Sequence, residues 1–202
     1  MAMPVRERRE RDRARRRQLI VAAARELAET EGWEAVTTRR LAERVEYSQP
    51  VLYSHFTGKA DIVRAVALEG FGDLTAELRS ARTAARSPAA ALRALAAAYQ
   101  RFAQSHPAVY DAMFVMPIDV PFAARDTPAA PRAAFAELLT ALTPLAEGRD
   151  VETLGEVAWS ALHGLATLAR SNRLRASHQQ ARLDLLVDQL TGRPAQHQPG
   201  RP

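Results

Sequence analysis

The sequence predicts an all-α protein, and three observations support this prediction. Apolar residues recur every three or four positions along most of the 202 residues, which is the spacing of one helix face. Gly32, Thr57-Gly58 and a group of prolines at 117–131 interrupt these periodic stretches. No stretch shows the alternation of apolar and polar residues that marks a strand. We expect an N-terminal arm at residues 1–17, two helical domains at 18–68 and 69–192, and a disordered tail at 193–202.

Composition excludes several classes of protein. The absence of cysteine rules out disulfides, thiol catalysis and cysteine-bound zinc. No run of about 18 apolar residues predicts a membrane helix, and the first residues lack the apolar core of a signal peptide. The five histidines show no metal-ligand spacing with carboxylates, and no glycine-rich phosphate loop or nucleophile–base pair is visible. We expect a cytoplasmic protein that is not an enzyme and has no catalytic residue, metal or cofactor.

The net charge of +5 is concentrated at the N-terminus. Residues 1–17 contain eight arginines and three acidic residues, which account for the whole excess. This basic arm favours a polyanionic partner, and nucleic acid rather than a membrane, because no bulky apolar face accompanies the charge. A solvated, partly helical extension explains the same composition equally well.

The N-terminal part of the chain predicts a helix-turn-helix unit. Its helices are expected near residues 18–30, 38–45, 49–56 and 59–82. Thr37 and Ser48 are suitable N-caps for the two short helices, and Pro50 falls in a first turn, where the missing N–H costs nothing. Two short helices joined by a tight turn, with a longer helix on each side, form such a unit.

The second short helix carries unusual side chains. Only Val51, Leu52 and Phe56 are available to face inward, which leaves Gln49, Tyr53, Ser54 and His55 outside, without any acidic residue. A merely solvated helix would favour Glu, Lys and Ala at these positions. In a helix-turn-helix unit this helix lies in the DNA major groove, and Gln, Tyr and His suit contacts to bases and phosphates. Double-stranded DNA is therefore the expected partner.

A longer motif indicates a family. The stretch "VTTRRLAERVEYSQPVLYSHFTGKADIVRAV" resembles the DNA-binding domain of the TetR family of bacterial transcriptional regulators, and the likeness covers about residues 18–68. The resemblance implies base contacts from Arg39 and Gln49, apolar contacts from Pro50 and Val51, and phosphate contacts from Thr38, Tyr53, His55 and Lys59. Ser54 stands where the tetracycline repressor of this family carries a tryptophan, so its role is open. Arg40 and Arg44 are expected to be solvated or paired with Glu43.

The C-terminal domain is expected to be a helical bundle. Helices are predicted at residues 88–104, 132–146, 150–170 and 177–191, with a short helix opening at 105–107 and a loop at 117–131. The stretch "AWSALHGLATLARSNRL" resembles the C-terminal domain of a TetR subgroup with a W-x-x-x-H-G motif, here Trp159, His163 and Gly164.

Aromatic and methionine side chains in this half suggest an adaptable, mostly apolar pocket. The candidates for a ligand wall are Tyr99, Phe102, Tyr110, Met113, Phe114, Trp159 and His163. Core packing explains every one of them as well. For His163 the simpler interpretation is a core histidine bonded to a carbonyl, with Gly164 allowing close helix packing.

Two apolar stripes predict a homodimer through the last two helices. One consists of Leu183, Leu186, Val187 and Leu190, and the other of Leu154, Val157, Ala161, Leu165 and Leu168. Part of each stripe must pack within its own subunit. The rest, paired with a symmetry mate, would form a four-helix bundle.

Together these features predict a ligand-responsive transcriptional regulator, most simply a repressor. It would bind palindromic operator DNA as a homodimer and be released by a small, mainly apolar molecule. Two alternatives stay open: a constitutive DNA-binding regulator without an effector, and a helical small-molecule-binding protein or enzyme.

Overall fold

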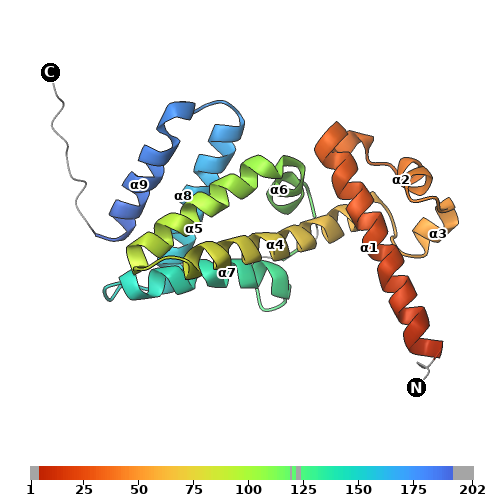
Figure 1. The fold of residues 1–202 in the computed structure, drawn as a ribbon, viewed down its shortest axis with the longest axis horizontal. Helices are drawn as coiled ribbons and strands as arrows, with labels where there is room; N and C mark the ends of the chain where they lie inside the picture. Colours follow the sequence, from red (N-terminus) through yellow and green to blue (C-terminus); the bar gives the residue numbers. More distant parts are fainter. Residues whose placement is uncertain (1–4, 119, 122–123, 193–202) are drawn as a thin grey trace. The chain divides into compact units, whose positions relative to one another are not determined.

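The all-α prediction is confirmed. The computed structural model describes residues 5–118, 120–121 and 124–192, and these ranges contain helices and no strands. The predicted tail at 193–202 lies outside the described residues. No helix in the described ranges is long and apolar enough to cross a membrane. The helices are α1 (Val5–Glu31), α2 (Thr38–Arg44), α3 (Gln49–Tyr53), α4 (Lys59–Thr83), α5 (Pro88–Ser105), α6 (Pro107–Phe114), α7 (Ala129–Leu142), α8 (Val151–Arg170) and α9 (Gln179–Leu190) (Figure 1).

The chain forms two compact units. The first unit takes its residues from 1–70 and 106–127, and the second from 71–105 and 128–202. The segment 106–127, which falls within the range expected for the C-terminal domain, thus groups with the N-terminal helices. Helix α4 begins in the first unit and continues into the second, and the chain also passes between the units after residues 105 and 127.

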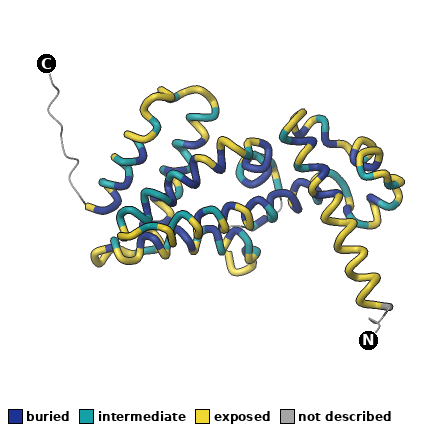
Figure 2. Tube along the Cα trace, in the orientation of Figure 1, coloured by how far each residue is buried: buried dark blue, intermediate teal, exposed yellow. Residues whose placement is uncertain are grey.

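Helix α1 changes character along its length. Ile20, Ala24 and Leu27 are buried, because their spacing keeps them on one face. Residues 6–19 are exposed on every side (Figure 2). The described part of the basic arm is therefore the beginning of α1 and not a separate segment. Arginine is a good helix former, so nothing in this stretch ends the helix.

The two short helices follow the predicted caps in part. The Thr37 hydroxyl accepts from the Arg40 N–H at 3.2 Å, as predicted, whereas Ser48 occupies the N-cap position without a side-chain capping bond. Helix α3 ends at Tyr53, three residues before the predicted end. The Ser54 hydroxyl donates to the Val51 carbonyl at 2.7 Å and so competes with the helix for that acceptor.

The turn between α2 and α3 places a non-glycine residue in the left-handed region. Glu46 has φ 57°, and the N–H of Tyr47 donates back to the Ala42 carbonyl at 2.9 Å. This is the Schellman arrangement, in which glycine usually takes the left-handed position. A residue with a Cβ costs roughly 1–2 kcal/mol more there.

Helix α6 is fastened to the N-terminal helices of its unit. The Glu29 carboxylate accepts from the N–H groups of Ala108 and Val109 at 3.0 and 3.1 Å, so it caps the first turn of α6. The Trp33 indole N–H donates to the Ala108 carbonyl at 2.8 Å. A Cβ added at Gly70 of α4 would lie 2.4 Å from the Val109 side chain, so the crossing of α4 and α6 requires glycine.

Helix α5 is the centre of the second unit and packs against α7, α8 and α9. The buried Gln100 amide donates to the Leu162 carbonyl of α8 at 2.8 Å. Helix α8 comes close to α7 at Gly155, where an added Cβ would lie 2.4 Å from Leu139. Gly164 has no such neighbour within 4 Å, so its predicted role in close packing within the chain is wrong.

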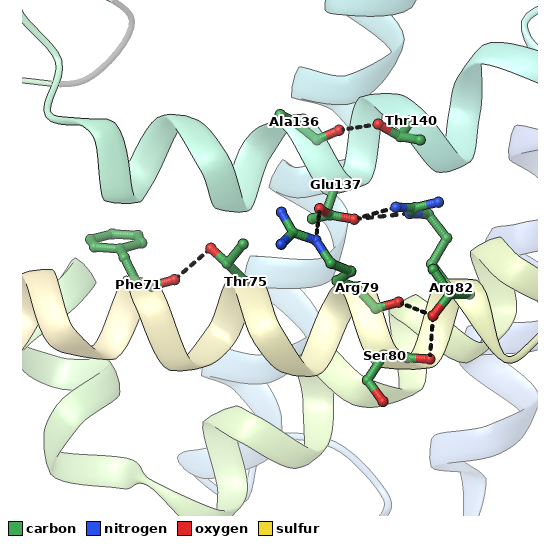
Figure 3. Close-up of polar contacts among 9 residues, drawn as sticks. Phe71, Thr75, Arg79, Ser80, Arg82, Ala136, Glu137 and Thr140 are labelled. Atoms are coloured by element: carbon green, nitrogen blue, oxygen red, sulfur yellow. Dashed lines mark hydrogen bonds and ion pairs between the residues drawn. The ribbon is translucent and has the colours of Figure 1, made fainter.

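A buried carboxylate joins α4 to α7. Glu137 accepts from Arg79 Nε at 2.7 Å and from Arg82 Nε and Nη2 at 2.9 and 2.7 Å (Figure 3). Burial alone would raise the pKa of Glu137, but the hydrogen bonds and charges of Arg82 and Arg79 outweigh burial and hold it below its usual value. The later turns of α4 are thereby tied to α7.

Boundaries near prolines differ from the prediction. Helix α7 begins at Ala129 and not at 132, because Pro128 occupies the N-cap and Pro131 lies in the first turn, where a missing N–H is tolerated. Its predicted end at 146 is a 3-10 turn at Thr143–Leu145. Another 3-10 turn, Ala176–His178, precedes α9, which begins at Gln179.

Candidate nucleic-acid interface

Helix α3 presents polar residues to solvent. Leu52 and Phe56 are buried beneath it, which fixes the opposite face outward. Tyr53 is 54% exposed, a high value for a tyrosine whose neighbours form a core. Six residues of this segment were predicted to face outward or to contact DNA. The exposed ones are Gln49, Pro50, Tyr53 and Ser54, and the half-buried ones are Val51 and His55. Their contacts to DNA stay predictions.

Helix α2 contributes Thr38 and Arg39. The Thr38 hydroxyl lies 3.4 Å from the Tyr53 hydroxyl, so two of the predicted phosphate ligands meet across α2 and α3. The Arg39 side chain is 79% exposed, and its Nε donates to Glu43 at 3.0 Å. A surface pair of this kind contributes about 0–1 kcal/mol, so Arg39 can exchange it for another acceptor.

Arg40 and Arg44 brace α2 against α1. Arg40 forms a two-point bond with Glu31 at 2.8 and 2.9 Å, and Arg44 reaches Glu26 at 2.6 Å. Both side chains are exposed, as expected, but the expected pairing with Glu43 is wrong, because carboxylates on α1 lie within reach. The Arg40 hydrogen bond lowers the pKa of Glu31.

Lys59 is half-buried at the start of α4. Its ammonium donates to the backbone carbonyl of Trp33, a contact that sequence reasoning missed. An ammonium has three donor hydrogens, so this bond fixes its position and leaves further donors for an anion. The predicted phosphate contact of Lys59 stays a prediction.

Sequence reasoning also missed two contacts between α1 and the end of α3. Arg13 Nη2 donates to the Ser54 carbonyl at 3.1 Å, and the Arg17 guanidinium lies 4.8 Å from the centre of the Phe56 ring. A signal was available in the spacing. Arg13 and Arg17 stand seven and three positions before Ile20, on the line that becomes the buried face of α1.

His55 lies in this arginine environment. Its Nδ1 is buried and has no hydrogen-bond partner among the described residues. Burial lowers the pKa of His55, and the charges of Arg13, Arg16 and Arg17 lower it further. The neutral ring is therefore favoured in the DNA-free protein, and a nearby phosphate would favour the protonated ring.

The candidates for the ligand wall divide between the two units. In the first unit, α6 carries Tyr110 and Met113, both buried, and the half-buried Phe114. The rings of Tyr110 and Phe114 lie 4.8 Å apart. These three residues thus form one aromatic and thioether group on a single short helix.

The other candidates lie in the second unit. Tyr99 and Phe102 are buried on α5, whereas Trp159 and His163 are half-buried on α8, with ring centres 6.3 Å apart. Burial lowers the pKa of His163, and the charge of Arg170 adds to this effect. That these candidates line a ligand cavity stays a prediction.

Two family models match the chain. Residues 20–66 match the model of bacterial regulatory proteins of the tetR family. Residues 92–190 match the tetracyclin repressor-like C-terminal domain.

Individual proteins agree with these matches. A helix-turn-helix transcriptional regulator of Mycobacterium tuberculosis is 33% identical over 157 residues, which cover 75% of this chain and 69% of that protein. The class C tetracycline repressor of Escherichia coli is 45% identical over 51 residues, 25% of this chain and 23% of the repressor. A Rhodococcus sp. RHA1 protein of unknown function has a structure with a TM-score of 0.75 and 27% identity, covering 87% of this chain and 93% of that one. The chain therefore belongs to the TetR family of bacterial transcriptional regulators and is not an enzyme.

Proposed function

We propose that this regulator is a repressor that binds a palindromic operator as a homodimer and is released by a small, mainly apolar molecule. The exposed face of α3 carries the proposal. This five-residue helix has no acidic residue, and it exposes a glutamine, a proline and a tyrosine that stabilise nothing within the chain by burial. The major groove of DNA provides acceptors, donors and methyl groups that suit those side chains.

Within this face, Gln49 and Arg39 are the proposed base readers. Each can form paired hydrogen bonds, glutamine with adenine and arginine with guanine. Both are exposed, and binding a base would break the surface pair of Arg39 with Glu43. Pro50 and Val51 follow Gln49 at the start of α3 and offer apolar contact to a thymine methyl.

The proposed phosphate ligands surround these residues. Thr38 and Tyr53 already lie together, Lys59 is fixed by the Trp33 carbonyl, and His55 gains a proton more easily beside an anion. Ser54 is different, because its hydroxyl and its carbonyl are both engaged within the chain. We assign Ser54 to holding the end of α3.

The outer face of α8 is the proposed centre of the dimer. Val157 and Leu168 are 56% and 39% exposed, with the half-buried Ala161 and Leu165 between them. Gly164 adds a position where a second helix can come close, since nothing in its own chain fills that space. This face is narrower than the predicted stripe, because Leu154 is buried within its own subunit.

Helix α9 adds to the proposed interface mainly through Leu185, which is 47% exposed. Leu183, Val187 and Leu190 of the predicted stripe are buried within the subunit, and Leu186 is half-buried. A two-fold axis beside α8 and α9 would join four helices and present two copies of α3 to one DNA duplex.

Release by a ligand would act through α4. We propose that Tyr99, Phe102, Trp159 and His163 of the second unit line the ligand cavity. The later turns of α4 are bound to α7 of this unit through Glu137, and its first turn holds Lys59. A shift of α4 would move that ammonium. A coupling of about 1–3 kcal/mol changes operator affinity by about 5–150-fold, and operator DNA weakens ligand binding equally.

The test begins with DNA fragments selected by the purified protein and sequenced. We expect an inverted repeat bound by a dimer, followed by release when apolar and aromatic compounds are added. Enrichment of no sequence would overturn the proposal as a whole. Specific binding that no compound in a broad screen weakens would leave the constitutive regulator in its place.

A further inference from the structure

We infer that the first half of α1 is a second phosphate-binding surface, which extends the contact made by α2 and α3 along the DNA backbone. The inference rests on the proposed DNA binding and concerns a different set of residues. The arginines of residues 6–17 then belong to one helix and bind phosphates through one of its faces.

The face follows from the spacing of the arginines. Intervals of three or four residues lead along α1 through Arg6, Arg9, Arg13 and Arg16, and then through Ile20, Ala24 and Leu27. Successive helical residues turn by about 100°, so all of these positions lie on one side. This side of α1 is apolar and buried from Ile20 onward, whereas before Ile20 it consists of arginines. We call these four arginines, together with Arg17 beside them, the arginine face.

The acidic residues of this segment lie elsewhere on the helix. Within about 50° of the middle of the arginine face, residues 6–17 include only arginines. Glu7, Glu10 and Asp12 fall outside this sector, where Glu10 pairs with Arg6 at 3.1 Å. The face therefore carries positive charge that the neighbouring carboxylates flank and do not interrupt.

Two contacts turn this face toward the DNA-binding helices. Arg13 reaches the Ser54 carbonyl, and Arg17 lies over the Phe56 ring. The arginine face therefore begins beside His55, one of the proposed phosphate ligands. From there the first turns of α1 lie beyond the other elements of this unit (Figure 1), and residues 6–17 are exposed (Figure 2).

The phosphates of a nucleic acid are a better partner for the arginine face than the surface of a membrane is. Ala14 is the only apolar residue in 6–17, whereas a helix that binds in a lipid interface needs a broad apolar face. Guanidinium groups bind phosphate oxygens in pairs, and a preformed helix loses little entropy on binding. From Arg6 to Arg16 the helix rises about 15 Å, alongside DNA that carries one charge per about 1.7 Å of its axis.

The chain offers a matched pair of variants. The face variant combines Arg6→Gln, Arg9→Gln and Arg16→Gln, and leaves Arg13 and Arg17 in their contacts. The control variant combines Arg8→Gln, Arg11→Gln and Arg15→Gln, which lie on the opposite side of the same turns. Both remove three charges per subunit and replace arginine with another good helix former, and equal circular dichroism would establish equal helix content.

Affinity for the selected operator and for random DNA is measured against salt concentration. We expect the slope of log K against log salt to become shallower in the face variant by about 0.9 for each lost contact, or up to about 2.7 per subunit. Both DNAs should lose affinity by the same factor, because phosphate contacts carry no sequence information. The control variant should change the slope by less than one contact.

Equal effects of the two variants would show that only net charge matters and would overturn the inference. An unchanged slope in the face variant would do the same, while operator binding by the unaltered protein would keep the proposed function intact. Loss of binding to vesicles of anionic phospholipid, with DNA affinity unchanged, would assign the face to a membrane. A wild-type protein that binds no DNA at all would instead overturn the proposed function.

Discussion

Gln49 tests base reading at the scale of a single residue. It begins α3 with an exposed side chain, and an amide paired with a base edge provides about 1–3 kcal/mol of discrimination. We expect Gln49→Ala to relax base preference at one or two positions of each half-site and to leave affinity for random DNA nearly unchanged. Sequencing of selected DNA measures the first effect, and titration with random DNA the second. Gln104→Ala, an exposed glutamine on α5, is the control.

Equal losses on operator and random DNA would contradict this role of Gln49. They would indicate that the side chain supports the fold of α3 or binds the backbone, and that another residue reads the base.

His55 should make operator binding depend on pH. In the free protein, burial and the nearby arginines lower its pKa, and phosphates in a complex would raise it again. The complex then binds more protons than the free protein, so operator affinity should rise as the pH falls from about 8 to about 6. Titrations at several pH values should show this rise for the wild type and a smaller rise for His55→Asn.

The lowered pKa of His55 also affects the stability of the fold, and in the opposite direction: the free energy of unfolding decreases as the pH falls. Because the folded protein holds His55 below its ordinary pKa of 6.5, the unfolded chain takes up this proton first as the pH falls. The contribution of His55 to the free energy of unfolding is therefore present above about 6.5 and decreases as the pH falls through the folded pKa. A pH-independent difference between wild type and His55→Asn would contradict the assignment.

Single residues show how far sequence reasoning reaches. The exposure of Gln49 and Tyr53 could be predicted, because residue type and helical spacing are local properties. The bond from Lys59 to Trp33 could not, since it joins residues 26 positions apart. For Arg13 the spacing indicated the side of α1 but not its partner Ser54, 41 positions away. Such contacts depend on how the helices pack.

At the scale of elements, Glu137 tests the tie between α4 and α7. Its side chain is 7% exposed between Arg79 and Arg82, and hydrogen bonds to charged groups contribute about 1.5–3 kcal/mol. We expect Glu137→Gln to lower the free energy of unfolding by about 1–3 kcal/mol in urea titrations. Glu43→Gln, which breaks an exposed pair, is the control and should change it by less than about 0.5 kcal/mol.

The pH dependence gives a second measurement of Glu137. Its folded pKa lies below the ordinary 4.5, so its stabilising contribution is present above about 4.5 and is lost as the pH falls through the folded value. The difference in unfolding free energy between wild type and Glu137→Gln should shrink accordingly. A difference that persists at low pH would mean that packing, and not charge, is responsible.

Elements were predicted well where periodicity is long and less well at their ends. The apolar spacing of α4, α5 and α8 located these helices within a few residues. The early end of α3 depends on a serine hydroxyl that competes for a carbonyl, and the early start of α7 on prolines that suit a first turn. Both effects are single local interactions that a hydrophobic pattern does not contain.

For the whole molecule, the dimer is the central prediction. Leu168 and Leu185 are large apolar side chains exposed on α8 and α9. We expect Leu168→Arg and Leu185→Arg together to give folded monomers with much weaker operator binding, because a buried interface does not accept unpaired charge. Sedimentation velocity measures the assembly. Val115→Arg, at a site that is 63% exposed in the first unit, is the control and should leave the dimer intact. A wild type that sediments as a monomer at micromolar concentration would contradict the model.

The division into units could be predicted only in part. A helix-turn-helix segment followed by a helical bundle was visible in the sequence, and the family models place matches in both. The grouping of 106–127 with the N-terminal helices was not visible in the sequence. It depends on hydrogen bonds of Ala108 with Glu29 and Trp33, which lie 79 and 75 positions earlier in the chain.

The position of Trp33 also gives the protein a built-in optical probe. The chain has two tryptophans, and each unit contains one: Trp33, buried with its indole N–H bonded to Ala108, and the half-buried Trp159. Fluorescence of the native protein during melting is therefore a sum over two units that need not unfold together. Trp159→Phe leaves an emission that reports only on the joint between α6 and the turn after α1, and Trp33→Phe leaves one that reports only on α8. The two single-tryptophan variants would therefore report the unfolding of the two units separately, without an attached dye.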